Sequence, residues 1–268
     1  MPTVNDPAVV ARRLEMSYGD IPAISSSDFT LPSPGLTVLM GPNGSGKSTL
    51  LAAIAGLQKP VGGTITVLGT TPGQARSRVA LVPQSTKVNE TLPVTVAEVV
   101  GMGRYAGLGM TGRFGGEDRR VVAEAIQRLD LASLSGRHLS ELSGGQRQRV
   151  FVAQGLVQER DLLLLDEPTT ALDLVSTHTI RQVIASEVSE GRPVVLTTHE
   201  LGEAMAADHV LLMSNRVVAE GAPDQVLTPE NLSVAYNLHV SEGPDGFHLD
   251  DAAHRPTAAR HIHGESAH

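Results

Sequence analysis

The sequence of 268 residues contains no cysteine, so the chain can form neither disulfides nor thiolate metal sites, as expected in a reducing compartment. It also lacks an excess of positive charge: 21 lysines and arginines stand against 29 aspartates and glutamates, a net charge of −8. Domains that bind nucleic acids usually carry a basic surface that neutralises phosphates. We therefore expect no nucleic acid partner.

Long apolar runs are absent as well. No uninterrupted stretch approaches the roughly 20 apolar residues that a helix needs to cross a bilayer. The start of the sequence, Met1 to Val10, lacks the basic and then apolar pattern of a signal peptide. These absences predict a chain that is made and kept in the cytosol. Its length fits one large or two modest domains with a sizeable buried core.

The first part of the chain is expected to be rich in β-structure. An apolar run at 36–40 feeds into a glycine-rich loop, and residues 48–57 then follow the pattern of a helix. Thr64 to Leu68 and Arg78 to Val82 are expected strands, separated from their neighbours by glycine and proline turns. The order strand, loop and helix is typical of nucleotide-binding α/β proteins.

Between about residues 85 and 142 apolar residues recur three and four positions apart, which predicts a helical insertion. Beyond it, expected strands at 162–165, 193–197 and 209–213 alternate with helical stretches. This alternation favours an α/β fold with a parallel sheet covered on both faces. We expect one domain over residues 1–240, followed by a polar tail at 241–268 without fixed structure.

The glycine-rich loop matches the phosphate-binding pattern G-x-x-x-x-G-K-[ST] at every required position. Its glycines let backbone N–H groups converge on phosphate oxygens without interference from Cβ atoms. We expect Lys47 to pair with the β- and γ-phosphates and Ser48 to give its hydroxyl to Mg²⁺, while the helix directs its positive N-terminal end at the nucleotide. The expected nucleotide-binding residues here are Gly41, Pro42, Asn43, Gly44, Ser45, Gly46, Lys47, Ser48 and Thr49.

Two acids follow the apolar run at 162–165. Asp166 emerges from a buried strand at the carboxyl edge of the expected sheet, where α/β proteins place ligands, so we expect it to hold Mg²⁺ through water. Glu167 points differently and could orient and polarise the water that attacks the γ-phosphate in line. We therefore predict that Glu167 is the catalytic base. The alternative, a solvated acidic pair, fits less well beside a complete phosphate loop.

A second anion site is expected at Ser143. This residue fits a helix N-cap, and Gly144 and Gly145 leave the first amides of the helix bare. The segment Leu142 to Gln146 reads Leu-Ser-Gly-Gly-Gln and stands shortly before the run that ends in Asp-Glu-Pro. Together with the phosphate loop far upstream, this order of motifs resembles the ATP-binding cassette, the motor subunit of ABC transporters.

This resemblance covers about Val9 to Val240 and implies a P-loop NTPase domain with a β-rich subdomain and a helical insertion. It implies that ATP is the fuel and Mg²⁺ the cofactor. In this family the signature residues bind the γ-phosphate of nucleotide held by another copy, so a head-to-tail homodimer with two ATP molecules is expected. The signature residues are Ser143, Gly144, Gly145 and Gln146.

Four further residues take their roles from their place in the family pattern. Tyr18 resembles the aromatic residue that stacks on adenine. Gln84 resembles the Q-loop glutamine, which approaches Mg²⁺ and moves with the transport partner, and His199 resembles the switch histidine that contacts the γ-phosphate. Asp173 ends a segment similar to the D-loop, which contacts the opposite subunit. Taken alone, Tyr18, Gln84 or His199 would more commonly be a structural residue, and it is their order that supports the assignment.

The surroundings of the cassette favour a transport ATPase that docks through its insertion on a separate integral membrane permease, with an extracytoplasmic substrate-binding protein as an indirect partner. Leu92 to Val96 and Val99 to Tyr105 resemble the zinc and manganese importers and, somewhat less, the iron-chelate importers. These segments would line the groove for the permease. Alternatively, their apolar positions form the core of the insertion. A second alternative is a soluble ABC ATPase without a permease, as in iron–sulfur cluster assembly.

The end of the chain is rich in histidine. Neutral imidazoles in a flexible segment can bind Zn²⁺, and such a tail could sense or buffer the metal. The alternative is a solvated terminus that is histidine-rich by chance. The residues concerned are His248, His254, His261, His263 and His268.

Overall fold

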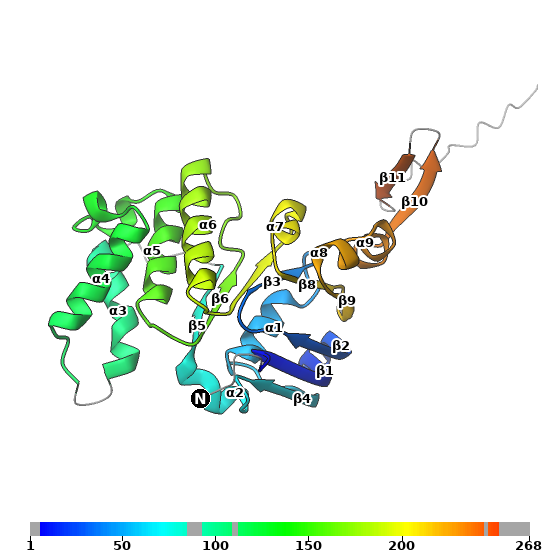
Figure 1. Ribbon diagram of the computed structural model, residues 1–268, viewed down its shortest axis with the longest axis horizontal. Helices are drawn as coiled ribbons and strands as arrows, with labels where there is room; N and C mark the ends of the chain where they lie inside the picture. The colour runs from blue at the N-terminus through cyan, green and yellow to red at the C-terminus, as the bar shows by residue number, and fades with distance from the viewer. Residues whose placement is uncertain (1–5, 85–92, 109–111, 244–245, 252–268) are drawn as a thin grey trace, which may run out of the picture.

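A computed structural model describes residues 6–84, 93–108, 112–243 and 246–251 (Figure 1). The strands are β1 (Val9–Tyr18), β2 (Ile21–Leu31), β3 (Leu36–Met40), β4 (Gly62–Val67), β5 (Val79–Val82), β6 (Leu162–Asp166), β7 (Val194–Thr198), β8 (His209–Met213), β9 (Val217–Gly221), β10 (Leu238–Gly243) and β11 (Gly246–Asp251). The α-helices are α1 (Lys47–Ile54), α2 (Pro72–Ala75), α3 (Val96–Leu108), α4 (Gly116–Arg128), α5 (Gly144–Leu156), α6 (Leu174–Ser189), α7 (Leu201–Met205), α8 (Pro223–Val226) and α9 (Pro229–Tyr236), with short 3₁₀ turns at Arg76–Arg78, Ala132–Leu134 and Leu139–Glu141.

The central sheet has six strands in the order β5-β6-β7-β3-β8-β9. Strands β5, β6, β7, β3 and β8 run parallel, which confirms the expected parallel arrangement for this part of the sheet. The edge strand β9 is antiparallel to β8 and was not expected from the sequence. All parallel strands end at the same edge, so the residues that follow β3, β5, β6 and β7 are brought together there.

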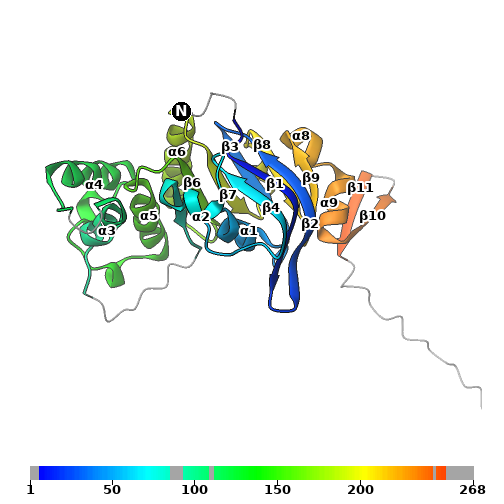
Figure 2. The same ribbon diagram turned by 90° about the horizontal axis from the view of Figure 1, so that it is seen from below.

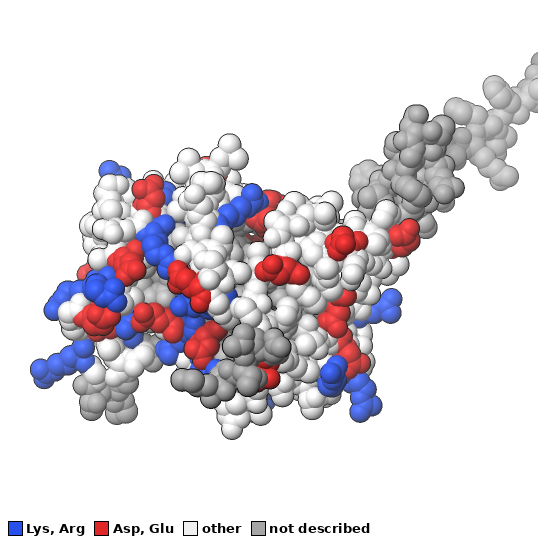
Figure 3. Space-filling view, viewed as in Figure 1, with Lys and Arg blue, Asp and Glu red and all other residues white. Residues whose placement is uncertain are grey.

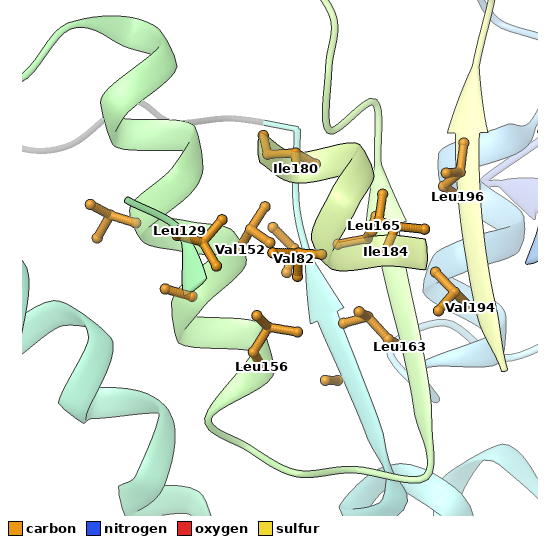
Figure 4. Packing of buried hydrophobic residues seen from close by; sticks show 14 of the residues in the cluster. Val82, Leu129, Val152, Leu156, Leu163, Leu165, Ile180, Ile184, Val194 and Leu196 are labelled. Carbon is orange, nitrogen blue, oxygen red and sulfur yellow. The ribbon is translucent and has the colours of Figure 1, made fainter. Parts of the chain in front are cut away.

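The leucine run of β6 is buried because both faces of the sheet are covered. Leu162 and Leu164 join a core with α1 and the antiparallel sheet β2-β1-β4. Leu163 and Leu165 face the other way, into a core shared with α5 and α6 (Figure 4). Alternation of side chains along a strand thus feeds two cores from one apolar run.

Helices α3, α4 and α5 form a separate helical part at one side of the molecule (Figures 1 and 2). Helix α3 packs closely on α5 at Gly103, where an added Cβ would lie 2.3 Å from the carbonyl oxygen of Gln154. Helix α5 in turn rests on β5 at Gly155, where a Cβ would lie 2.5 Å from Val82 Cγ2. The expected insertion is therefore helical over its described residues, and α5 packs with it, whereas residues 85–92 lie outside the described part.

The C-terminal segment differs from the expected tail where it is described. Strands β10 and β11 pair antiparallel from Leu238 to Asp251, so the polar sequence after residue 240 first forms a hairpin. Residues 252–268 lie outside the described part. Acidic and basic side chains are interspersed over the helical part on the face seen in Figure 3. Among the described residues, no helix is both long and apolar enough to cross a membrane.

Candidate active site

The phosphate loop connects β3 to α1, and its glycines are required by close contacts. At Gly41 an added Cβ would lie 2.1 Å from the carbonyl oxygen of Met213. Gly46 caps α1 with a φ of 99°, and a Cβ there would lie 2.8 Å from the carbonyl oxygen of Ala23. Gly44 also has a positive φ, 79°. The loop thus folds between β2 and the end of β8, with bare amides at the start of α1.

Lys47 lies inside this loop. Its ammonium donates hydrogen bonds to the carbonyl oxygens of Gly41 at 2.7 Å and Pro42 at 3.0 Å. Burial lowers the pKa of Lys47, and the nearby carboxylates of Glu167 and Asp166 act in the opposite direction. A buried ammonium next to the bare amides at the start of α1 is suited to hold phosphate oxygens.

Ser48 and Asp166 meet as the sequence predicts. The Ser48 hydroxyl donates to Asp166 Oδ1 at 3.2 Å, and the Thr197 hydroxyl donates to the same oxygen at 2.6 Å. Asp166 ends β6 and Ser48 lies in the first turn of α1, so strand and loop converge on one point. Hydroxyl and carboxylate oxygens are the ligands that Mg²⁺ prefers, and these two are near enough to contact one cation.

Glu167 follows Asp166 but takes a different direction. Its backbone has a φ of 46°, a left-handed conformation that is uncommon for a residue with a side chain. The backbone amide donates to Thr197 Oγ1 at 2.8 Å, and the side chain accepts a hydrogen bond from Gln84 Nε2 at 2.7 Å. The turn after β6 therefore separates the two acids and places Glu167 beside Gln84, which follows β5.

Tyr18 and His199 lie at the margins of this edge. Tyr18 ends β1 and is 58% exposed, and its hydroxyl accepts a hydrogen bond from Thr49 Oγ1 at 3.3 Å. This contact fixes an open aromatic ring next to α1. His199 is exposed directly after β7, which neighbours both β6 and β3 in the sheet. No hydrogen bond within the described part links His199 to the phosphate loop.

The signature segment forms the expected N-cap of α5. Ser143 Oγ accepts from the amide of Gln146 at 3.3 Å, and Gln146 Oε1 accepts from the amide of Ser143 at 3.0 Å. This reciprocal capping box fixes the start of the helix. Within the described residues no hydrogen bond joins this segment to the phosphate loop. Helices α5 and α1 belong to the two different cores that cover the two faces of the sheet.

The two signature glycines have different surroundings. A Cβ on Gly144 would have open space around it. A Cβ on Gly145 would lie 2.4 Å from Asp173 Oδ2 and 2.5 Å from Ser176 Oγ. Asp173 caps α6 by accepting from the amide of Ser176 at 2.8 Å, and this hydrogen bond lowers the pKa of the carboxyl. The signature and the D-loop segment are thus adjacent in one chain.

Sequence reasoning missed Asn215 and Thr197. Asn215, in the turn between β8 and β9, donates its backbone amide to the carbonyl oxygen of Ser45 at 3.0 Å and its side-chain amide to that of Gly44 at 3.2 Å. These two hydrogen bonds hold the phosphate loop at Gly44 and Ser45. The left-handed turn residue between two strands is a local signal, but nothing in the sequence shows which loop it contacts.

The expected histidine tail is largely outside the described part of the chain. His254, His261, His263 and His268 are not described, and His248 lies in β11. Among the described residues, no group of three or more His, Asp and Glu side chains is arranged to hold a metal ion. The zinc-binding interpretation of the tail stays a prediction.

Residues 24–170 match the family model described as ABC transporter. The chain belongs to the ABC transporter family. As an ATP-binding cassette of this family it is an ABC-type ATPase that binds ATP. The matched residues include the phosphate loop, the signature segment and the acids Asp166 and Glu167 at the end of β6. The motifs and the fold therefore agree.

Curated relatives of this ABC protein are transport subunits. The chain is 38% identical to the zinc transport system ATP-binding protein TroB of Treponema pallidum, over 87% of this chain and 88% of TroB. It is 34% identical to the manganese transport system ATP-binding protein MntA of Synechocystis, over 80% and 84%. It is 35% identical to the chelated iron transport system protein YfeB of Yersinia pestis, over 91% and 85%.

Solved structures agree with the fold. The cbiO1 subunit of Clostridium perfringens, part of the ABC transporter complex cbiONQ, superposes with a TM-score of 0.72 at 27% identity. The superposition covers 87% of this chain and 95% of cbiO1. The likeness therefore extends beyond the phosphate loop to the whole cassette, including the helical part.

Proposed function

We propose that this ABC protein is the motor subunit of an importer for a divalent metal ion, zinc or manganese. The observation that carries the proposal is the match to TroB over nearly the full length of both chains. The manganese relative MntA supports the same class of cargo. The segment Val99 to Tyr105, in which the sequence resembles these importers, lies on α3. Met102 and Tyr105 are exposed there, whereas Val99 and Val100 are buried in the core of the helical part.

Hydrolysis would use the residues gathered at the carboxyl edge of the sheet. Lys47 and the amides of the phosphate loop bind the β- and γ-phosphates, and Glu167 orients and polarises the attacking water. His199 contacts the γ-phosphate from the end of β7. Ser48, Asp166 and the side-chain oxygen of Gln84 would hold Mg²⁺, which supplies neutralisation of phosphate charge when bound.

A head-to-tail homodimer is the proposed working state. Gly144 leaves the capped end of α5 open to a phosphate from another copy, because no atom of the described residues of its own chain fills the space where a Cβ would lie. Two exposed apolar side chains directly follow the D-loop segment at the start of α6: Leu174 is 88% exposed and Val175 is 62% exposed. Large exposed apolar residues of this kind mark an interaction surface.

The helical part offers a groove for the permease. A cavity of about 640 Å³ lies between α3 and α4, and its walls include Ala97, Met102, Tyr105 and Phe114. Met102 and Tyr105 are 45% and 60% exposed. An apolar groove on an amphipathic helix pair suits an inserted helix of a partner. Docking there would hold the subunit at the cytosolic face of the membrane, with the substrate-binding protein on the other side of the permease.

An iron-chelate importer is the second candidate, because YfeB is nearly as similar as TroB. A permease-free ATPase of the iron–sulfur assembly type has less support, since the relatives named above are subunits of transport systems. Co-purification with a membrane protein that has several apolar helices would separate transport from this last alternative.

The test is the total content of zinc, manganese and iron in cells grown under metal limitation, measured by mass spectrometry. Cells with the Glu167→Gln form are compared with cells that carry the native chain. We expect a selective fall in zinc or manganese that supplementation with that metal restores. A selective fall in iron would favour the chelate importer, and unchanged levels of all three would contradict metal import.

A further inference from the structure

A buried hydrogen bond joins the two loops that carry Glu167 and His199. Thr169 lies two residues after Glu167, and Glu203 lies four residues after His199, in α7. The Thr169 hydroxyl donates to Glu203 Oε1 at 2.7 Å. Both residues are buried, Thr169 being 5% and Glu203 8% exposed. Strands β6 and β7 are neighbours in the sheet, so this hydrogen bond joins the segment that follows β6 to the segment that follows β7.

Arg181 of α6 completes the arrangement. Its guanidinium donates to Glu203 Oε1 through Nε at 3.1 Å and Nη2 at 2.9 Å, and through Nη2 to Glu200 Oε2 at 3.3 Å. The other carboxylate oxygen, Glu203 Oε2, is buried and has no hydrogen-bond partner within the described residues. A carboxylate that is desolvated and only half satisfied contributes little net stability, so its presence calls for another explanation.

The packing of α7 against α6 is incomplete. A cavity of about 360 Å³ lies between α6 and α7, with Ile184, Val188, Leu196 and Ala206 among its walls. Helix α7 has only five residues, Leu201–Met205, and two of its apolar side chains, Leu201 and Met205, are 47% and 55% exposed. Since dispersion contacts are missing across a cavity, the hydrogen bonds of Glu203 fix the position of α7.

We propose that Glu203 is a positioning residue that couples the turn of Glu167 to the loop of His199. Pro168, whose ring fixes its φ, is the single residue between Glu167 and Thr169, so a displacement of Thr169 reaches Glu167 through a short and restricted segment. Glu203 holds the Thr169 hydroxyl and thereby sets where Glu167 lies relative to His199. This role rests on the proposed function, in which both side chains act on one γ-phosphate.

The test is the steady-state hydrolysis of ATP by the full chain. Thr169→Val removes the hydroxyl at nearly constant volume and should lower kcat about tenfold, because a small misplacement of a catalytic group is costly. KM for ATP should stay within about twofold, since neither Lys47 nor the phosphate loop is altered. Thr169→Ser keeps the donor and should restore the native kcat. An unchanged kcat in Thr169→Val would overturn the proposal.

Glu187 provides a matched control. Its side chain is 1% exposed and pairs with Arg128 and Arg192, but it lies near the far end of α6. Glu203→Met, which removes both carboxylate oxygens at similar length, should lower kcat, whereas Glu187→Met should lower the melting temperature and leave kcat unchanged. If the variants at Glu203 and Glu187 lost kcat equally, the loss would come from general destabilisation by removal of a buried charge. That outcome would overturn the positioning role of Glu203.

Glu167→Gln, measured in the same series, separates the two claims. Loss of hydrolysis in Glu167→Gln together with native kcat in Thr169→Val would refute the positioning role and leave the proposed function standing. Native turnover in Glu167→Gln would remove Glu167 as the base, and with it the reason for a coupling through Glu203. Loss of kcat in Thr169→Val and Glu203→Met, with no further loss in the double variant, is the expected result.

Discussion

The side-chain amide of Gln84 donates a hydrogen bond to Glu167 Oε2 at 2.7 Å and so joins the residue that follows β5 to the residue that follows β6. The two positions are 83 residues apart in sequence. Between them lies the whole helical part, with the groove proposed to receive the permease. A partner that displaces the segment after Gln84 would therefore act on the proposed base directly.

The first prediction concerns this bond. Gln84→Ala should lower kcat for ATP hydrolysis about tenfold, because a hydrogen bond to a charged group contributes roughly 1.5 kcal/mol and Glu167 would lose its fixed direction. Gln84→Glu should reduce kcat further, since it places a second carboxylate against Glu167. Gln74→Ala, a change at an exposed glutamine in α2, should hydrolyse ATP at the native rate. A native kcat in Gln84→Ala would show that Glu167 is held by its backbone alone.

The second prediction separates the signature glycines. Gly145→Ala places a Cβ against Asp173 and Ser176, so it should destabilise the fold by about 1–3 kcal/mol and impair hydrolysis. Gly144→Ala has open space within its own chain and should keep the native melting temperature, yet it should impair hydrolysis where a partner's nucleotide must approach. Thermal unfolding and ATPase assays on both variants provide the measurement. Full activity in Gly144→Ala would contradict the proposed dimer site.

The third prediction concerns Lys47. Lys47→Ala should weaken ATP binding by roughly a hundredfold, the loss expected for hydrogen bonds to charged phosphates worth about 3 kcal/mol. The free variant should melt no lower than the native chain, since the buried ammonium is desolvated, as its lowered pKa indicates. Calorimetric titration with ATP gives the affinity. Lys59→Ala, at an exposed lysine beyond α1, should bind ATP as the native chain does.

The fourth prediction concerns Asn215, which supports the phosphate loop at Gly44 and Ser45. Asn215→Gly keeps the left-handed backbone but removes the side-chain donor, so KM for ATP should rise about threefold to tenfold while the melting temperature changes little. Asn215→Ala should also strain the turn, whose φ is 52°. The matched change Asn237→Gly, at another left-handed residue after α9, should leave KM unchanged.

The fifth prediction is a pH dependence of stability. Burial lowers the pKa of His209 below its ordinary value of 6.5, an effect opposed by Glu220, and its Nε2 has no hydrogen-bond partner within the described residues. Below this ordinary value the unfolded chain binds the proton before the folded chain does, so stability falls as the pH falls. The melting temperature should fall between pH 7.5 and pH 5.5 in both proteins, and the fall should be smaller in His209→Leu than in the native chain. Equal losses in both proteins would exclude His209 as a source.

Local patterns predicted the elements that bind nucleotide. Strand β3, the phosphate loop and α1 follow one another in sequence, and the leucine run of β6 is buried on both faces as expected. Strand β1 escaped detection because bulges near Leu14 and Met16 break its alternation. The contacts of Gln84 with Glu167, of Asn215 with the loop and of Thr169 with Glu203 join distant segments, and composition does not encode such pairings.

The close contacts at Gly103 and Gly155 hold α5 near its C-terminal end, and they act as a fulcrum for any tilt of the helix. Near its C-terminal end α5 rests on β5 at Gly155, and α3 contacts it close by at Gly103. Ser143 lies at the opposite end of α5, twelve residues before Gly155 and therefore about 18 Å away along the helix axis. A tilt of about 10° around this fulcrum would carry Ser143 by about 3 Å, the difference between a hydrogen bond and none. In the proposed dimer, a partner that moves α3 would therefore alter the binding of nucleotide at Ser143 through a displacement of only a few ångströms.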